Sequence, residues 1–243
     1  MKRIFLTTVS LGVLGLTSPV LAADLPYAKA QAVPPQLYDW SGVYAGAFGG
    51  GGLGNHNLDN ANGPAGAANF TINYDSTGWI GGGEVGYNWQ SGNYLIGVEA
   101  DAFWSGIKGS DASQQLGVVD QSNLRWGGTL RARGGIAVDR LLLFFTGGYA
   151  FGDIVHTSTA PGFPVDQFTN HRNGLTAGGG IGYAITNNVI GKLEYRFYDL
   201  GKYERAGSTL SPNGQLPYSV DSTYSVVTIG FDFKFGAPVV AKY

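Results

Sequence analysis

The end of the chain alternates strictly between large hydrophobic residues and small or charged ones. A two-residue period predicts a β-strand, because successive side chains point to opposite faces of a sheet. Charged side chains are costly in a soluble core, and an aromatic row facing water promotes aggregation. Both of these unfavourable placements are avoided if the aromatic row faces lipid and the charged row faces the lumen of a closed barrel. The apolar face is Val227, Ile229, Phe231, Phe233 and Phe235, and the other face is Thr228, Gly230, Asp232 and Lys234.

Seven further segments show similar alternation or the turn residues that accompany it. They predict an all-β fold, an eight-stranded antiparallel transmembrane β-barrel. Three connections are about three residues long and four run roughly 18 to 27 residues, and short periplasmic turns with long outer loops are typical of bacterial outer-membrane barrels. The expected strands are Trp40–Gly50, Gly78–Gln90, Tyr94–Trp104, Asn123–Ala137, Leu141–Gly152, Gly174–Ile185, Val189–Asp199 and Val226–Phe235.

The polar faces of these strands bring charged residues together in the predicted lumen. In the fourth strand, Leu124 and Trp126 are expected to face lipid, while Arg125 and Arg131 face inward. Eight strands enclose an interior just wide enough for side chains to fill. The nearly neutral charge set therefore predicts a salt-bridged plug, with a charged constriction that selects small polar solutes as the alternative. The set is Glu84, Glu99, Asp101, Arg125, Arg131, Arg133, Lys192, Glu194, Arg196, Asp232 and Lys234.

The beginning of the chain has the organisation of a secretory signal peptide. Residues 1–3 are basic after the initial Met, residues 4–16 are apolar apart from Thr, Ser and Gly, and Ala22 ends a Val-Leu-Ala sequence. The apolar stretch is too short to span a bilayer as a helix, so we expect cleavage after Ala22. Residues 23–39 are rich in Pro and Ala and predict an extended periplasmic segment. The barrel is expected over residues 40–235, followed by a C-terminal tail at residues 236–243.

Composition favours a barrel over a soluble domain. Of the 243 residues, 40 are Gly and 13% are charged, whereas an average soluble chain has about 7% Gly and about 25% charged residues. The net charge of −2 predicts no attraction to nucleic acid, and the absence of Cys excludes disulfides and thiol catalysis. A secreted lipocalin-like barrel, the main soluble alternative, would carry its apolar rows inside.

Candidate chemistry is sparse. The three histidines, His56, His156 and His171, all fall in the predicted outer loops, where we expect them to be solvated; the alternative is that grouped imidazoles bind haemin. Asp153, His156 and Ser158 are close in sequence, but a predicted loop does not order them as a catalytic triad. The Gly-rich stretches lack the Gly-Lys-Ser/Thr ending of a phosphate-binding loop. We therefore expect no enzymatic activity, no cofactor and no metal site.

Six blocks spread over the predicted mature chain carry a family resemblance. They are residues 23–26 (ADLP), 39–46 (DWSGVYAG), 97–101 (GVEAD), 131–135 (RARGG), 146–150 (TGGYA) and 192–201 (KLEYRFYDLG), of which the last is the most specific. In these blocks the chain resembles the porin-family outer-membrane β-barrel proteins of the outer-membrane immunogenic protein group. The resemblance implies an eight-stranded barrel with surface-exposed loops and a structural or porin-like role, and some relatives bind haemin.

Together, these features predict an exported, monomeric integral protein of the Gram-negative outer membrane with a structural or porin-like role in the cell envelope. The expected partners are outer-membrane lipid, the barrel assembly machinery, and a small solute or haemin. The alternative function is a surface receptor or adhesin that acts through the outer loops. Many relatives end at the last aromatic residue of the final strand, whereas this chain continues to Tyr243, so Phe235 and Tyr243 are both candidate assembly signals.

Overall fold

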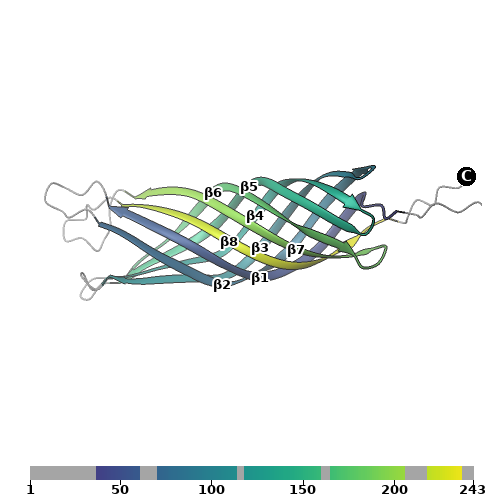
Figure 1. Cartoon of the computed structure of the whole chain (residues 1–243). Coiled ribbons are helices and arrows are strands. Elements are labelled where there is room, and N and C mark those ends of the chain that lie inside the picture. Colours follow the sequence, from purple (N-terminus) through teal and green to yellow (C-terminus); the bar gives the residue numbers. More distant parts are fainter. Residues whose placement is uncertain (1–36, 61–69, 114–117, 160–164, 206–217, 237–243) are drawn as a thin grey trace, which may run out of the picture. The chain divides into compact units, whose positions relative to one another are not determined.

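The structure, a computed structural model, describes residues 37–60, 70–113, 118–159, 165–205 and 218–236. Eight antiparallel strands pair in chain order, and the last pairs with the first to close a barrel (Figure 1). Closure gives every strand two neighbours, so the barrel has no edge strand. Only Leu175–Ala184 of β6 pairs with β7, and the part of β6 nearer the other end pairs with β5 alone. The predicted fold class is confirmed. The strands are β1 (Gly42–Asn60), β2 (Phe70–Ser91), β3 (Tyr94–Ser113), β4 (Val118–Val138), β5 (Leu141–Thr159), β6 (Asp166–Ala184), β7 (Val189–Arg205) and β8 (Tyr218–Lys234).

The two ends of the barrel differ in their connections. At one end, which we call the turn end, short turns join β2 to β3, β4 to β5 and β6 to β7. Gly92 and Asp139 have positive φ angles of 59° and 49° in these turns, a backbone region that Gly adopts freely and Asp tolerates. At the other end, the loop end, the connecting residues 61–69, 114–117, 160–164 and 206–217 lie outside the described residues. The predicted signal peptide and most of the C-terminal tail also lie outside them.

The strands are longer than the alternation predicts. β1 and β2 contain 19 and 22 residues and extend toward the loop end far beyond their expected limits at Gly50 and Gly78. Much of the sequence that was expected to form long outer loops is therefore strand. Within the described residues there is no helix that is long and apolar enough to cross a membrane.

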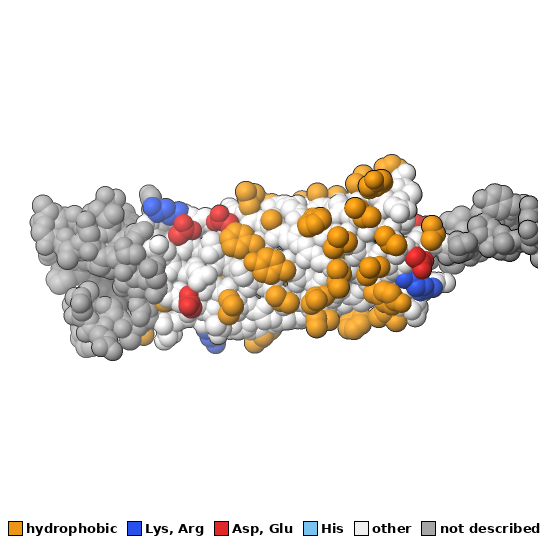
Figure 2. Space-filling view, in the orientation of Figure 1, with side chains coloured by type: hydrophobic (Ala, Val, Ile, Leu, Met, Phe, Trp, Pro, Cys, Tyr) orange, Lys and Arg blue, Asp and Glu red, His pale blue; other side chains and the backbone are white. Residues whose placement is uncertain are grey.

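The outer wall of the barrel carries a continuous apolar belt. On β3, Tyr94, Ile96, Val98 and Trp104 are 57–72% exposed, whereas the intervening Leu95, Glu99 and Phe103 are buried. Figure 2 shows one face of the barrel, on which hydrophobic side chains gather in the half opposite the loop end and charged side chains lie mainly near the two ends. The span from Tyr94 to Trp104 matches the roughly 9–11 residues that a tilted strand needs to cross a bilayer. Indole rings mark its limit toward the loop end, because Trp104 pairs directly with Trp126 of β4.

One predicted face assignment is wrong. Leu124 is buried in the lumen and Arg125 is exposed on the outer wall, the reverse of what alternation predicts. The register shifts between Leu124 and Trp126 in the β4–β5 pair, and between Trp104 and Ile107 in the β3–β4 pair. An irregularity of one residue moves the following side chains to the other face. The prediction for the fourth strand therefore holds from Trp126 toward the turn end and fails beyond it.

The lumen is filled in layers. Near the turn end lies an apolar cluster that we call the turn-end layer, and nearer the loop end lies a second one, the upper apolar layer. The charged residues lie between the two. The turn-end layer is Tyr38, Trp40, Leu95, Ala137, Leu142, Phe144, Ala184 and Ile190. The upper apolar layer is Phe48, Ile80, Phe103, Ile107, Leu124, Ala150, Ile154, Tyr198, Leu200, Tyr224 and Val226.

Candidate functional site: the charged layer of the lumen

Nine buried ionisable residues from β2, β3, β4, β7 and β8 form the charged layer. Strand pairing places opposite charges side by side, since Glu99 pairs with Arg131 across β3 and β4. Arg131 pairs with Gly148 of β5, and Glu194 pairs with Gly180 of β6, so a glycine on the neighbouring strand leaves room beside each long side chain. The layer comprises Glu84, Glu99, Asp101, Arg131, Arg133, Lys192, Glu194, Arg196 and Asp232, all less than 9% exposed.

Arg131 is the cation with the most carboxylate partners at short distance. Its guanidinium forms an ion pair with Glu99, lies 2.5 Å from Glu194 Oε1 and lies 3.2 Å from Asp101 Oδ2. A planar guanidinium with five N–H donors can bond several carboxylates at once, which an ammonium group cannot do with the same directionality. Its side chain and those of its three partners are fully shielded from solvent. Arg131 thus ties β4 to β3 and β7 across the lumen.

Lys192 and Arg196 of β7 complete the network. Lys192 Nζ lies 2.5 Å from Glu84 Oε2 and 3.5 Å from Glu99 Oε2. Arg196 reaches Asp101 and Glu194, each at 3.1 Å. Its guanidinium also lies 4.4 Å from the centroid of the Phe48 ring. Positive and negative groups therefore alternate through the layer, and a cation–π contact joins it to the upper apolar layer.

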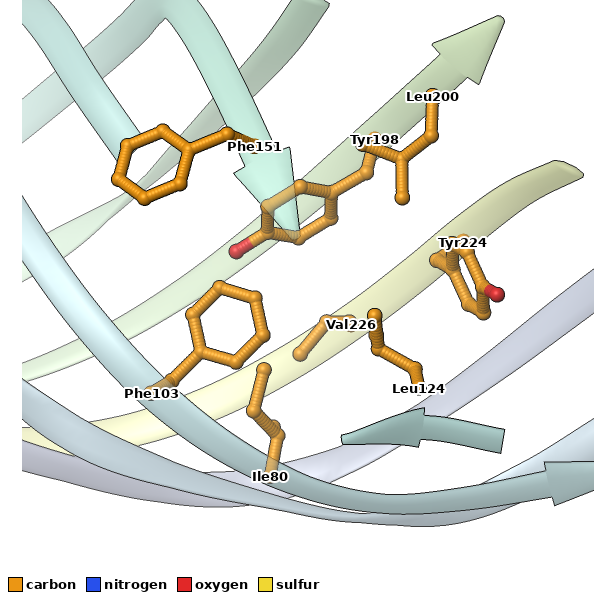
Figure 3. A pocket seen from close by; sticks show the side chains of 8 residues that line it. All are labelled: Ile80, Phe103, Leu124, Phe151, Tyr198, Leu200, Tyr224 and Val226. Carbon is orange, nitrogen blue, oxygen red and sulfur yellow. The ribbon is translucent and has the colours of Figure 1, made fainter. Parts of the chain in front are cut away.

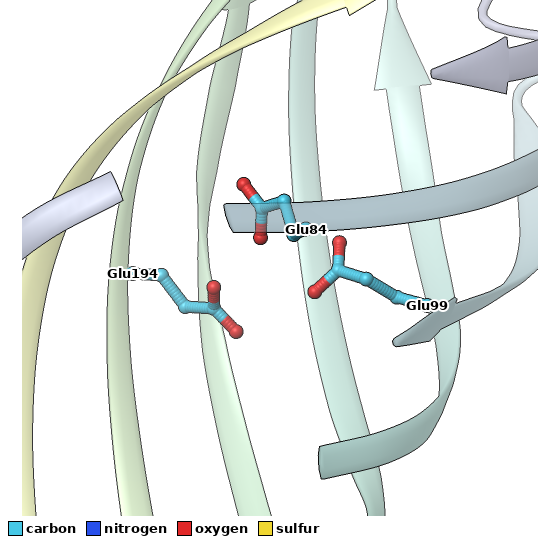
Figure 4. A group of neighbouring side chains, drawn as sticks. All are labelled: Glu84, Glu99 and Glu194. Carbon is cyan, nitrogen blue, oxygen red and sulfur yellow. The ribbon is translucent and has the colours of Figure 1, made fainter. Parts of the chain in front are cut away.

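Three carboxylates converge at the centre of this layer, as Figure 4 shows for Glu84, Glu99 and Glu194. Oxygen atoms of all three lie within 4.8 Å of one another, close enough to hold a cation. Lys192 Nζ, however, lies within 4.0 Å of an oxygen of each of the three. Lys192, Arg131 and Arg196 together thus supply three positive charges against the three glutamates, and the cluster is a salt-bridged assembly.

Two of the eleven residues predicted for the lumen charge network lie elsewhere. Arg125 is on the outer wall, as described above. Lys234 lies at the turn end, where its ammonium group donates a hydrogen bond to the backbone carbonyl of Asp39 and lies 4.5 Å from the centroid of the Tyr38 ring. Sequence reasoning did not include Tyr44, whose hydroxyl lies 2.6 Å from Glu99 and accepts a hydrogen bond from Arg133 at 2.9 Å. Tyr44 and Phe48 are an even number of residues apart and therefore share one face of β1. The strand contains too many glycines for that face to be assigned to the lumen from the sequence.

Among the described residues, two small cavities lie beside this layer. A cavity of about 10 Å³ lies in the upper apolar layer, where Ile80, Phe103, Tyr198 and Val226 converge (Figure 3). A second cavity of about 10 Å³ lies between the charged layer and Trp40. A cavity of this size holds about one water molecule. Neither cavity provides a continuous aqueous path.

The chain closes the turn end with its own N-terminal segment. Trp40 is 1% exposed, its indole N–H donates to the Asp139 carbonyl at 2.9 Å, and its backbone N–H donates to Gln90 at 2.8 Å. The Tyr38 hydroxyl lies 3.2 Å from the Asn187 carbonyl, and burial raises the pKa of Tyr38 to about 12. Tyr38, expected in the extended segment, is therefore a neutral hydrogen-bond donor docked against the barrel.

The histidines do not form the group that haemin binding would use. His56 is buried in β1 between Ser222 and Ser76, with 3.0 Å from each ring nitrogen to a hydroxyl oxygen. His156 is buried in β5 with Nδ1 2.8 Å from the Ser122 hydroxyl. His171 faces outward from β6, with Nδ1 2.5 Å from Asp153. The prediction that the histidines lie in outer loops is wrong, because all three lie in strands. The prediction that they are solvated is wrong for the buried His56 and His156 and holds for His171, whose side chain is 82% exposed.

A closed β-barrel with an apolar belt outside and a charged lumen inside defines an integral outer-membrane protein. The comparison with known families agrees: the model of the "Outer membrane protein beta-barrel domain" family matches residues 16–235. The chain belongs to this family.

Curated relatives extend over most of the chain. It is 30% identical to the 31 kDa outer-membrane immunogenic protein of Brucella melitensis, over 97% of this chain and 100% of the relative. It is 35% identical to the 22 kDa outer membrane protein of Rhizobium leguminosarum bv. viciae, over 66% of this chain and 64% of the relative. The resemblance to the outer-membrane immunogenic proteins is confirmed.

Solved structures also align with the barrel. The outer membrane protein OprG from Pseudomonas aeruginosa has 14% sequence identity and a TM-score of 0.48, with 81% of this chain and 97% of that chain covered. Neisserial surface protein A has 14% identity and a TM-score of 0.43, with 80% and 98% covered.

Proposed function

We propose that this protein is a closed, non-enzymatic barrel that stabilises the outer membrane and does not conduct ions. One observation carries the proposal: the charged layer lies between two apolar layers and leaves cavities of only about 10 Å³. A hydrated ion entering from either end meets apolar side chains before it reaches the charges. Desolvating an ion at such a layer is costly.

Opening the lumen would require the salt-bridged residues to separate. Arg131 contacts Glu99, Asp101 and Glu194, and withdrawing it leaves Glu99 and Glu194 without their nearest cation. Breaking one buried ion pair costs about 3–5 kcal/mol. The network therefore supports a stable plug over a constriction that passes small polar solutes.

The same proposal includes export and orientation. Residues 1–22 act as a cleaved signal peptide, the turn end faces the periplasm, the loop end faces outward, and the barrel is a monomer in the membrane lipid after insertion by the barrel assembly machinery. The absence of catalysis is supported by Asp153 and His156, since His156 is buried in the lumen while Asp153 contacts Trp126 and His171 on the outer wall. These two candidate catalytic groups lie on opposite faces of β5.

Planar-bilayer recording of the refolded protein tests the proposal. We expect no stable conductance steps from protein whose insertion is verified by heat-modifiable migration on a gel. Trp40→Ala is the matched variant, because it removes an indole from the turn-end closure and leaves the charged layer intact; it should also remain silent. Reproducible steps of constant size in the wild-type protein would contradict a closed barrel.

A further inference from the structure

The register irregularity near the loop end creates a basic site on the outer wall. On β3 and β4 it lies immediately beyond Trp104 and Trp126, where the apolar belt ends. It leaves Arg125 outside the regular pairing and exposed. Lys108 of the adjacent strand pairs with Asn123 and is also exposed on the outer wall. Two cations from neighbouring strands thus lie on the loop-end side of a pair of indole rings: Arg125 is one residue from Trp126, and Lys108 is four residues from Trp104.

Neither cation is neutralised by the barrel. Among the described residues, neither Lys108 nor Arg125 forms an ion pair with a carboxylate. Asp75 of β2 is exposed on this wall two residues before Thr77, which pairs with Lys108, but it forms no ion pair with either cation. The acid nearest to the indoles in the register is Asp153, which pairs with Trp126. Its two carboxylate oxygens are engaged by the Trp126 indole N–H at 2.9 Å and by His171 Nδ1 at 2.5 Å. Both cations are therefore available to an anion from outside the protein.

The surface above the cations is polar and recessed. A hollow of about 360 Å³ is lined by Lys108 and by hydroxyl and amide side chains of β3 to β6, including Ser110, Gln121, Asn123 and Thr157. The surface below is apolar: Trp104 and Trp126 are 67% and 42% exposed, and Trp79 lies over Gly106 beside them. Indole rings of this kind lie at the headgroup level of a membrane. The site therefore presents apolar, cationic and polar surfaces in succession along the barrel wall.

We propose that Lys108 and Arg125 bind the phosphate of an acylated, phosphorylated glycolipid in the leaflet around the loop end. The acyl chains pack on the indoles, the phosphate lies between the two cations, and the sugar hydroxyls contact the polar hollow. A guanidinium bonds phosphate oxygens bidentately, and the ammonium group adds a second charge. The side of the membrane rests on the proposed orientation, but binding itself does not depend on it. This order of chemical groups matches an amphiphile and not a free anion.

Binding measured in detergent micelles tests the site. Purified, folded protein is titrated with bis-phosphorylated lipid A and, separately, with its dephosphorylated form, and complexes are counted by native mass spectrometry. We expect the phosphorylated lipid to bind and the dephosphorylated form to bind on the order of tenfold more weakly, because it lacks the charge-assisted hydrogen bonds. Added salt should weaken binding of the phosphorylated lipid, since the cations are exposed.

Variants localise the effect. The double variant Lys108→Gln, Arg125→Gln should lose the preference for phosphate, and Arg125→Lys should retain part of it. Lys202→Gln is the matched control, because Lys202 is an exposed lysine of β7, a strand that does not adjoin β3 or β4. Equal affinity of wild type and double variant would overturn the site, as would equal binding of inorganic phosphate alone, which has no chains for the indoles. Conductance recordings are unaffected by these outcomes, so a failure here is distinguishable from a failure of the closed-barrel proposal.

Discussion

Replacing Arg131 by Met tests the charged layer most directly. The variant keeps most of the side-chain volume and removes the cation that lies among Glu99, Asp101 and Glu194. Loss of one partner from a buried ion pair costs about 3–5 kcal/mol in soluble proteins. Each stranded carboxylate retains a second cation here, since Arg133 lies 3.4 Å from Glu99 and Arg196 lies 3.1 Å from both Asp101 and Glu194. We therefore expect Arg131→Met to lower the free energy of unfolding by about 3 kcal/mol, the lower end of that range.

The measurement is equilibrium unfolding in urea from lipid vesicles, with the folded fraction read from heat-modifiable migration and tryptophan fluorescence. Adding Glu99→Gln removes one of the stranded charges and should recover part of the loss, as a double-mutant cycle would quantify. Leu130→Arg, one residue away and 62% exposed on the belt, should cost roughly 2–4 kcal/mol near the membrane midplane. Leu130→Met is the neutral control. An unchanged midpoint for Arg131→Met would refute the network as a source of stability, and equal tolerance of Arg131→Met and Leu130→Arg would refute the face assignment.

Three further substitutions probe other parts of the lumen by the same unfolding measurement. Tyr44→Phe removes the hydroxyl that bridges Glu99 and Arg133 and should cost about 1–3 kcal/mol, whereas Tyr195→Phe, on the exposed side of β7, should be close to neutral. Gly148→Ala places a Cβ against the Leu130 carbonyl and should cost about 1–3 kcal/mol, whereas Gly134→Ala meets nothing within 4 Å and should leave the midpoint unchanged. Trp40→Ala should cost about 3–5 kcal/mol through the cavity that it creates; a wild-type midpoint would show that the N-terminal segment adds nothing to stability.

Within the apolar belt, the sequence predicts the faces of the strands well. Lipid outside and charges inside impose opposite requirements on neighbouring residues, so Val98 and Glu99, or Leu193 and Glu194, can be assigned without a structure. The same contrast predicts most of the charged layer. It does not predict which carboxylate each cation contacts, because that depends on the pairing register and on the glycines of β5 and β6.

Beyond the belt, the contrast between apolar outward-facing residues and charged inward-facing residues disappears. Both faces of β1 become polar near Asn55 and Asn57, so the strand cannot be distinguished from a loop by alternation, and His56 was assigned to a loop for this reason. The register irregularity at Arg125 is not indicated by the sequence either. Leu124 suits the upper apolar layer as well as it suits lipid, and the sequence Leu-Arg-Trp continues the two-residue period without interruption. The sequence interpretation also missed the two apolar layers, because it considered only the charged residues of the inward faces together and did not group the apolar ones.

The docked N-terminal segment has a consequence for the order in which the barrel assembles. Trp40 is held by Gln90 of β2 and by Asp139 of the turn between β4 and β5, and Asp39 is held by Lys234 of β8. Its binding site is thus built from distant parts of the chain and does not exist until those strands have met. The segment that precedes the first strand in the sequence must therefore be among the last to dock, and burial of the Trp40 indole reports that the barrel is complete.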